Sequence, residues 1–245
     1  MIRITRQIPA EQIQLLIFDL DGTLVDSKLD LAHAVNAMLR NYHRPELPIE
    51  VIGGYIGDGA PMLVRRALGD PDDECFVKEA LEHFMVYYRA HKLDNTRAYP
   101  GIAEQLETFQ QRGLRMAVLT NKPVNPSRGI CEGLNLSRFF VQVYGGNSFE
   151  TKKPDPLGAR KLLEETGVAP EHAVMIGDSQ NDVLTALNAG MWSLGVTYGF
   201  SPDSLKIHPP DVLVDSPGEL ALALGVHAPA AQSSREVPSG EGFTS

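Results

Sequence analysis

The sequence predicts an α/β protein with a doubly wound parallel sheet and a second, helical unit inserted into it. Three observations support this. Short apolar runs of strand length are flanked by Gly, Asp or Asn, helical periodicity lies between most of them, and one long segment has no strand. Strands that alternate with helices pair in parallel through right-handed crossovers, and such pairing produces a doubly wound sheet.

The expected strands are compact apolar runs. They lie at residues 15–18, 115–119, 141–144, 173–176, 191–196 and 212–214. Helical patterns are expected between them, at residues 102–112, 159–166 and 181–188. Gly167 and Gly190 follow the last two patterns, at the position where a helix commonly ends.

The segment after the first strand differs from the rest of the chain. From Leu31 through Val35 and Leu39, apolar side chains recur at helical spacing, and no convincing strand is present. We therefore expect two structural units, a core domain of residues 1–27 and 97–226 and a helical cap domain of residues 28–96.

Both ends of the chain are expected to lie outside the packed core. Residues 227–245 are small, polar and rich in Pro and Gly, so they cannot bury enough apolar surface to offset their ordering, and we expect a disordered tail. The first ten or so residues are expected to form a loose extension.

Composition narrows the class of protein. The net charge of −9 disfavours nucleic acid and anionic membranes as partners. No apolar run approaches the roughly 20 residues that span a bilayer, and no signal peptide is evident, so a cytoplasmic location is expected. Cys75 and Cys131 form no CxxC pair and are expected to be reduced thiols.

The first motif is DLDGTLVD, which begins at Asp19 directly after the first strand. Ligands of open α/β sheets bind beyond the carboxyl ends of the strands, and Asp21, two residues on, can face the same crevice. An ionised Asp19 can attack phosphorus, and a protonated Asp21 can supply the proton of a leaving group. By itself the motif could also be a turn with capping aspartates.

Two further motifs can bind a phosphoryl group. Thr120 and Asn121 follow the second strand, where a hydroxyl and nearby amides can hold a phosphoryl oxygen, although such residues are usually turn formers. Lys153 precedes a rigid Pro-Asp-Pro frame and can place a fixed positive charge in the cleft. That frame makes Lys153 a better candidate than Lys152, although a Lys-Lys pair is most often a solvated surface.

The fourth motif, GDSQND, contains Asp178 at a strand end and Asp182 four residues later. Hard oxygen ligands of this kind suit Mg²⁺, which takes few carboxylates and keeps several waters. The alternative is a helix cap, a role that Asp178 and Ser179 both favour.

Taken together, DLDGTLVDS, LTNK, KPDP and GDSQND resemble the four-motif signature of the haloacid dehalogenase superfamily. The segment between the first two motifs resembles the helical C1 cap of that superfamily. Residues 56–60 and 63–68, the pair Gly145-Gly146 and the pair Tyr198-Gly199 resemble its phosphoglycolate phosphatase branch. The resemblance covers roughly residues 13–225.

The resemblance implies a fold and an activity. It implies a Rossmann-like core with a C1 cap, and a Mg²⁺-dependent phosphatase that acts on a small organic phosphate, with 2-phosphoglycolate as the best candidate. The partner would be a small phosphorylated metabolite, and the protein would be a monomer or a homodimer.

Site roles follow from the same resemblance. Asp19 would form the aspartyl-phosphate and bind the metal, and Asp21 would be the general acid and base and bind the metal through its carbonyl. Thr120, with Asn121 beside it, and Lys153 would bind the phosphoryl group. Further roles are implied for Asp178, as the third metal ligand, and for Asp182, which would orient the metal site.

Several alternatives stay open at this stage. A phosphomutase of the β-phosphoglucomutase kind or an inorganic pyrophosphatase shares the core, and a non-catalytic binding protein is the remote alternative. In the cap, the turn at Gly57 could contact the leaving group or simply begin a helix. Five basic residues are candidates for an acidic leaving group: Arg65, Arg66, Arg89, Lys92 and Arg97.

Overall fold

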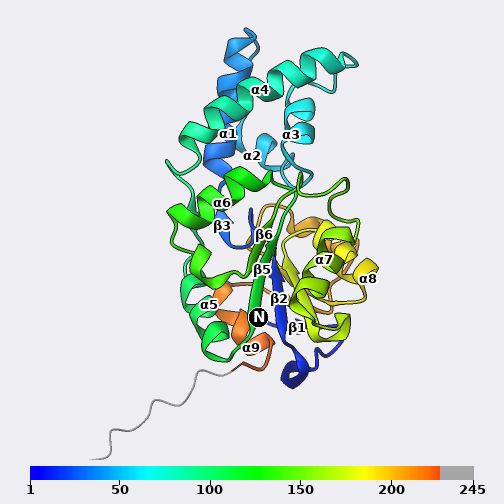
Figure 1. The fold of residues 1–245 in the computed structure, drawn as a ribbon. Helices are drawn as coiled ribbons and strands as arrows, with labels where there is room; N and C mark the ends of the chain where they lie inside the picture. The colour runs from blue at the N-terminus through cyan, green and yellow to red at the C-terminus, as the bar shows by residue number, and fades with distance from the viewer. Residues whose placement is uncertain (227–245) are drawn as a thin grey trace, which may run out of the picture.

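The computed structural model describes residues 1–226, and the expected disordered tail lies outside the described residues (Figure 1). The predicted fold class is confirmed. A seven-stranded sheet has the order β1-β9-β8-β7-β2-β5-β6, and every pairing in it is parallel except that of β1. Its strands are β1 (Arg3–Ile4), β2 (Leu15–Phe18), β5 (Arg115–Leu119), β6 (Gln142–Tyr144), β7 (Ala173–Gly177), β8 (Trp192–Val196) and β9 (Val212–Val214).

Helices cover both faces of this sheet. Figure 1 shows α7 and α8 on one side and α5 and α9 on the other. Alternating residues of β2 divide accordingly, because Leu15 and Ile17 belong to the apolar cluster of α7 and α8, whereas Leu16 and Phe18 belong to that of α5, α6 and α9. These helices are α5 (Ile102–Gln111), α6 (Val124–Gly133), α7 (Leu157–Thr166), α8 (Gln180–Ala189) and α9 (Leu220–Ala223).

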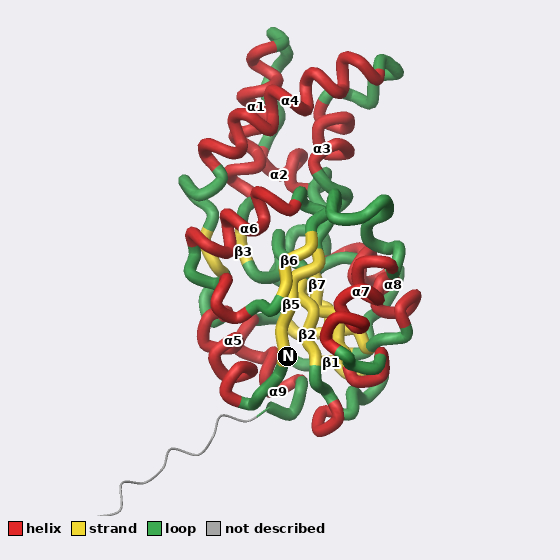
Figure 2. The backbone as a smooth tube through the Cα atoms, in the orientation of Figure 1, coloured by secondary structure: helices red, strands yellow, loops and turns green. Residues whose placement is uncertain are grey.

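Four helices form the inserted cap, which Figure 2 shows as a group beyond one end of the sheet. They are α1 (Lys28–Asn41), α2 (Ile49–Gly53), α3 (Ala60–Ala67) and α4 (Glu74–His91). The cap has an apolar cluster of its own, to which the periodic residues Leu31, Val35 and Leu39 contribute. None of the helices in the described part of the chain is long and apolar enough to cross a membrane.

Two short strands that the sequence does not signal connect cap and core. β3 (Val25–Asp26) pairs antiparallel with β4 (Arg97–Ala98). Beside them, the buried carboxylate of Asp30 accepts hydrogen bonds from the backbone and side chains of Asn95 and Thr96. Burial alone would raise the pKa of Asp30, but these hydrogen bonds outweigh it and lower the pKa. The two chain segments that enter and leave the cap are therefore held side by side.

The N-terminus departs from the expectation of a loose extension. β1 pairs antiparallel with β9, with Arg3 opposite Leu213. Asp215 holds this strand, because it accepts from the Arg3 guanidinium and from the terminal amine of Met1. A strand of two residues has no detectable alternation, so the sequence could not reveal it. The expected free thiols are found, with Cys75 exposed and Cys131 buried.

Candidate active site

The site lies at the carboxyl ends of three adjacent strands. β2 lies between β5 and β7 with Phe18 opposite both Val118 and Ile176, so the residues after these strands meet at one edge. Asp19 follows β2, Thr120 follows β5 and Asp178 follows β7. All three are buried. The parallel register therefore brings together candidates that lie far apart in the sequence.

Lys153 joins two of the acidic residues. Its ammonium lies 3.0 Å from Asp19 Oδ1 and 2.6 Å from Asp182 Oδ1, and its side chain is 1% exposed. The Asp182 Oδ2 atom accepts from the backbone and hydroxyl of Ser179, which closes a capping box at the start of α8. Lys153 and Ser179 therefore hold Asp182 beside the cleft.

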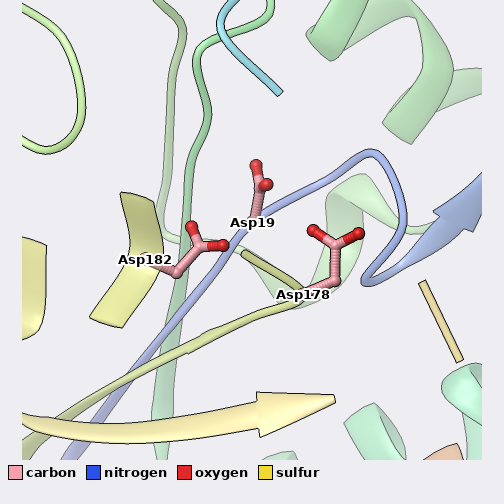
Figure 3. A group of neighbouring side chains, drawn as sticks. All are labelled: Asp19, Asp178 and Asp182. Carbon is pink, nitrogen blue, oxygen red and sulfur yellow. The ribbon is translucent and has the colours of Figure 1, made fainter. Parts of the chain in front are cut away.

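Asp19, Asp178 and Asp182 form a buried acidic cluster in which one oxygen of each lies within 4.8 Å of the others. Figure 3 shows the three side chains coming from three separate segments, with their carboxylates on the same side. With Lys153 as the cation paired to two of them, the cluster carries an excess of negative charge. A divalent cation bound by hard oxygen atoms would balance that charge, so these residues fit a magnesium site.

The electrostatics of the cluster support this fit. Burial raises the pKa of Asp19 to about 6, with the opposing attraction of Lys153 as the next largest effect and the Asp182 carboxylate adding to the rise. Burial, together with Asp182 and Asp19, raises the pKa of Asp178 to about 8 against the backbone amides of Phe200 and Ser201. Ionising Asp178 at neutral pH is therefore unfavourable until a cation is present.

Two glycines let the backbone approach Asp178. Gly22 has φ of +80°, and a Cβ there would lie 2.2 Å from Asp178 Oδ2. A Cβ on Gly199 would lie 2.4 Å from the same oxygen. Any larger residue at either position would displace this carboxylate, so both loops depend on glycine at this point.

Asp21 is held by a residue to which the sequence analysis gave no role. Lys122 Nζ lies 3.1 and 2.9 Å from the two Asp21 oxygens, and the Ser27 hydroxyl donates to Oδ1 at 2.5 Å. Lys122 is buried, and burial by itself would lower the pKa of its ammonium. The attraction of the Asp21 carboxylate opposes this effect, so the pKa of Lys122 is raised. The sequence signal that could have indicated this role is the position of Lys122 in the LTNK motif, two residues after Thr120.

The cap closes over this edge through polar contacts at one turn. Asn121 Nδ2 donates to Gly57 O at 3.0 Å, Lys152 Nζ to Asp58 O at 2.6 Å, and Asn181 Nδ2 to Asp58 Oδ1 at 2.9 Å. Lys152 therefore contacts the cap turn, whereas Lys153 lies beside Asp19. Gly59 directly precedes α3 and has φ of +85°. A Cβ on it would lie 2.8 Å from Asn121 O, so the turn needs glycine to pack against the core.

A pocket lies between the cap and the core. Asp19, Asp21, Thr120, Asn121 and Lys122 line its core side. Gly57 and Gly59 line it from the cap, together with mainly apolar side chains that include Leu31, Ile56, Leu63, Phe84 and Met85.

The basic cap residues proposed from sequence are not among the residues lining this pocket. Arg65 binds Glu74, Arg66 binds Asp58, and Arg97 binds backbone carbonyls near its own position. Lys92 donates to Arg89 O. The geometry therefore gives none of these side chains contact with a molecule in the pocket.

The fold and the site define the class of protein. The family model of the haloacid dehalogenase-like hydrolases matches residues 16–196. The chain belongs to this family, and it is a phosphatase of the phosphoglycolate phosphatase-like branch.

Relatives in that branch match most of the chain. A phosphoglycolate phosphatase of Pseudomonas savastanoi pv. phaseolicola is 41% identical over 77% of this chain and 71% of its own. One of Pseudomonas putida is 35% identical over 93% of this chain and 88% of its own. A crystal structure described as a predicted phosphoglycolate phosphatase from Haemophilus somnus superposes with a TM-score of 0.81 at 32% identity, covering 86% of this chain and 97% of that one.

Proposed function

We propose that this phosphatase hydrolyses 2-phosphoglycolate, or a closely similar small phosphate monoester, through an aspartyl-phosphate on Asp19. One observation carries the proposal. The Asp19 carboxylate lies 3.0 Å from the Lys153 ammonium, and it faces a cap-covered pocket that Asp21 also lines. A nucleophile and a proton donor therefore line one pocket, and a cation for the phosphoryl group lies directly beside the nucleophile.

In the first half-reaction, an Asp19 oxygen attacks phosphorus while the bond from phosphorus to the leaving oxygen breaks. Asp21 gives its proton to that oxygen, so the alcohol leaves neutral at this atom. Lys153 and Thr120 stabilise the charge on the phosphoryl oxygens, because both lie beside Asp19. Lys122 holds the Asp21 carboxyl in position through its two oxygens.

In the second half-reaction, Asp21 takes a proton from water, and the water oxygen attacks phosphorus. The bond from phosphorus to Asp19 breaks, which releases inorganic phosphate and restores both carboxyl groups. The apolar walls of the pocket limit the entry of other water.

The acidic cluster supports Mg²⁺ as the cofactor. Asp19 and Asp178 would hold it with the Asp21 carbonyl, and Asp182 would orient the site through Lys153 and Ser179. The bound ion would neutralise charge on the carboxylates and on the phosphoryl oxygens.

The choice of substrate rests on the relatives and on the pocket. The relatives named phosphoglycolate phosphatase share 35–41% identity with this chain. The pocket offers few polar groups beyond those that serve the phosphoryl group, which suits a small leaving group better than a sugar with many hydroxyls.

A release assay tests the proposal. Purified protein is given 2-phosphoglycolate, glucose 1-phosphate, pyrophosphate and a panel of other phosphate esters, with Mg²⁺ or with EDTA. We expect Mg²⁺-dependent release of phosphate with the highest kcat/KM for 2-phosphoglycolate. An isomerised sugar phosphate without free phosphate would instead identify a mutase, and faster cleavage of pyrophosphate would identify a pyrophosphatase.

A further inference from the structure

Tyr88, near the end of α4, is a buried polar residue that the steps above do not use. Its side chain is 2% exposed and lines the pocket between cap and core. Its hydroxyl has no partner of normal hydrogen-bond geometry among the residues that the structure describes, and the neighbouring Lys122 ammonium can only donate to it, so its O–H group has no acceptor. A buried hydroxyl without a partner costs stability, so its presence at a pocket wall points to a partner that arrives with the ligand.

Lys122 lies directly beside this tyrosine. Its ammonium is 4.5 Å from the centre of the Tyr88 ring, and it is the single cation among the described residues that line the pocket. Its two hydrogen bonds both go to one carboxylate, that of Asp21, and an ammonium has three donors. Lys122 therefore places a positive charge next to the Tyr88 hydroxyl.

The surroundings of this pair restrict what can bind to it. The neighbouring cap side chains in the pocket are Leu31, Leu63, Phe84 and Met85, none of which can hydrogen-bond to a sugar. A donor pair in an apolar enclosure suits one compact acceptor group, and a carboxylate accepts from a hydroxyl and an ammonium together. Burial raises the pKa of Tyr88 to about 12, so the hydroxyl keeps its proton at neutral pH and donates it.

We propose that Tyr88, with Lys122, binds the carboxylate of the leaving group and so selects short phosphorylated acids. This inference rests on the proposed function, in which the phosphoryl group lies against Asp19 and the leaving group faces the cap. It places specificity on α4 and on the residue after Asn121, and not on the basic side chains of the cap surface.

The test uses the full-length protein with Mg²⁺ and the neutral substrate 2-hydroxyethyl phosphate, whose leaving group has a hydroxymethyl group in place of the carboxylate. Glycolate is added as a competitor. Tyr88→Phe removes only the hydroxyl, and Tyr87→Phe is the matched control, because Tyr87 is the preceding residue of the same helix and does not line the pocket.

We expect Tyr88→Phe to weaken inhibition by glycolate about 10- to 100-fold, the range for one hydrogen bond to a charged group. Hydrolysis of 2-hydroxyethyl phosphate should stay within about threefold of wild type, and Tyr87→Phe should change neither value. Melting temperature separates recognition from structure, because removing an unpartnered hydroxyl should leave it equal or higher.

Two results would overturn the inference: equal inhibition of wild type and Tyr88→Phe by glycolate, or equal loss of inhibition and of neutral-substrate turnover in a folded variant. The proposed substrate has a separate readout, which is turnover of 2-phosphoglycolate by wild type. If wild type failed to cleave that ester while glycolate still inhibited through Tyr88, the substrate would be wrong and the carboxylate site would stand.

Discussion

Lys153 and Lys152 are adjacent lysines with very different surroundings, and replacing each by Met tests the assignment of the phosphoryl site. Lys153 is 1% exposed, with its ammonium 3.0 Å from Asp19 and 2.6 Å from Asp182. Lys152 is exposed and donates to a single carbonyl, that of Asp58. Methionine keeps most of the volume of lysine, so the comparison isolates the charge.

The expected magnitudes follow from these contacts. Breaking a buried ion pair by removing one partner costs about 3–5 kcal/mol, so Lys153→Met should destabilise the metal-free fold by a few kcal/mol. Loss of one preorganised electrostatic contact in the transition state should lower kcat about 10²- to 10³-fold. For Lys152→Met we expect the fold to be destabilised by less than about 1 kcal/mol and kcat to change by less than about tenfold.

The assay is phosphate release from 2-phosphoglycolate at saturating Mg²⁺, with urea unfolding of the same samples. Because Lys153 lowers the pKa of Asp19, its removal should also move the acidic limb of the pH–rate profile to higher pH. A larger loss of kcat for Lys152→Met than for Lys153→Met, with both variants folded, would refute the assignment.

Three further predictions address the nucleophile, the hinge and the acidic cluster. Asp19→Asn should lower kcat by about 10³-fold or more while circular dichroism stays unchanged, and near-normal turnover would exclude the covalent mechanism. Asp30→Asn should lower the free energy of unfolding in urea by about 1.5–3 kcal/mol, because the charged carboxylate accepts buried hydrogen bonds. The exposed Asp26 is the control, and Asp26→Asn should change this free energy by no more than about 0.5 kcal/mol. Equal losses of stability in the two variants would contradict the role of Asp30. In metal-free protein, the folded state keeps a proton on Asp178 up to its pKa of about 8, whereas the unfolded chain loses it near 3.8. The folded state therefore binds more protons between these values, so stability should fall as pH rises through this window, and Asp178→Asn should flatten the profile.

The sequence predicted which residues meet at this edge of the sheet, because their positions follow from local patterns. Asp19, Thr120 and Asp178 each follow an apolar run, and parallel pairing brings such positions together whatever the intervening chain does. The Pro-Asp-Pro frame also distinguished Lys153 from Lys152, and the structure places Lys153 beside Asp19.

What the sequence did not predict depends on tertiary packing. Tyr88 occupies an apolar position of an amphipathic helix, and such a position is indistinguishable from core until the cap is placed over the sheet. Arg65 and Arg66 looked like candidates for an acidic leaving group because nothing in the sequence indicates that Glu74 and Asp58 bind them. The edge strand at Arg3 was missed because two residues carry too little periodicity.

The paired segments beneath the cap also constrain how the pocket can open. With β3 and β4 hydrogen-bonded to each other and Asp30 binding Asn95 and Thr96, the cap cannot lift away along one connection while the other stays fixed. The cap can rotate as one rigid body about the β3–β4 pair. At the turn of Gly57 and Asp58 such a rotation breaks three hydrogen bonds to the core, worth about 3 kcal/mol at a typical net value of about 1 kcal/mol each. By these bonds alone, the open form would be populated on the order of 1%, which is enough for exchange of a small metabolite and little enough to keep the reacting phosphate dry.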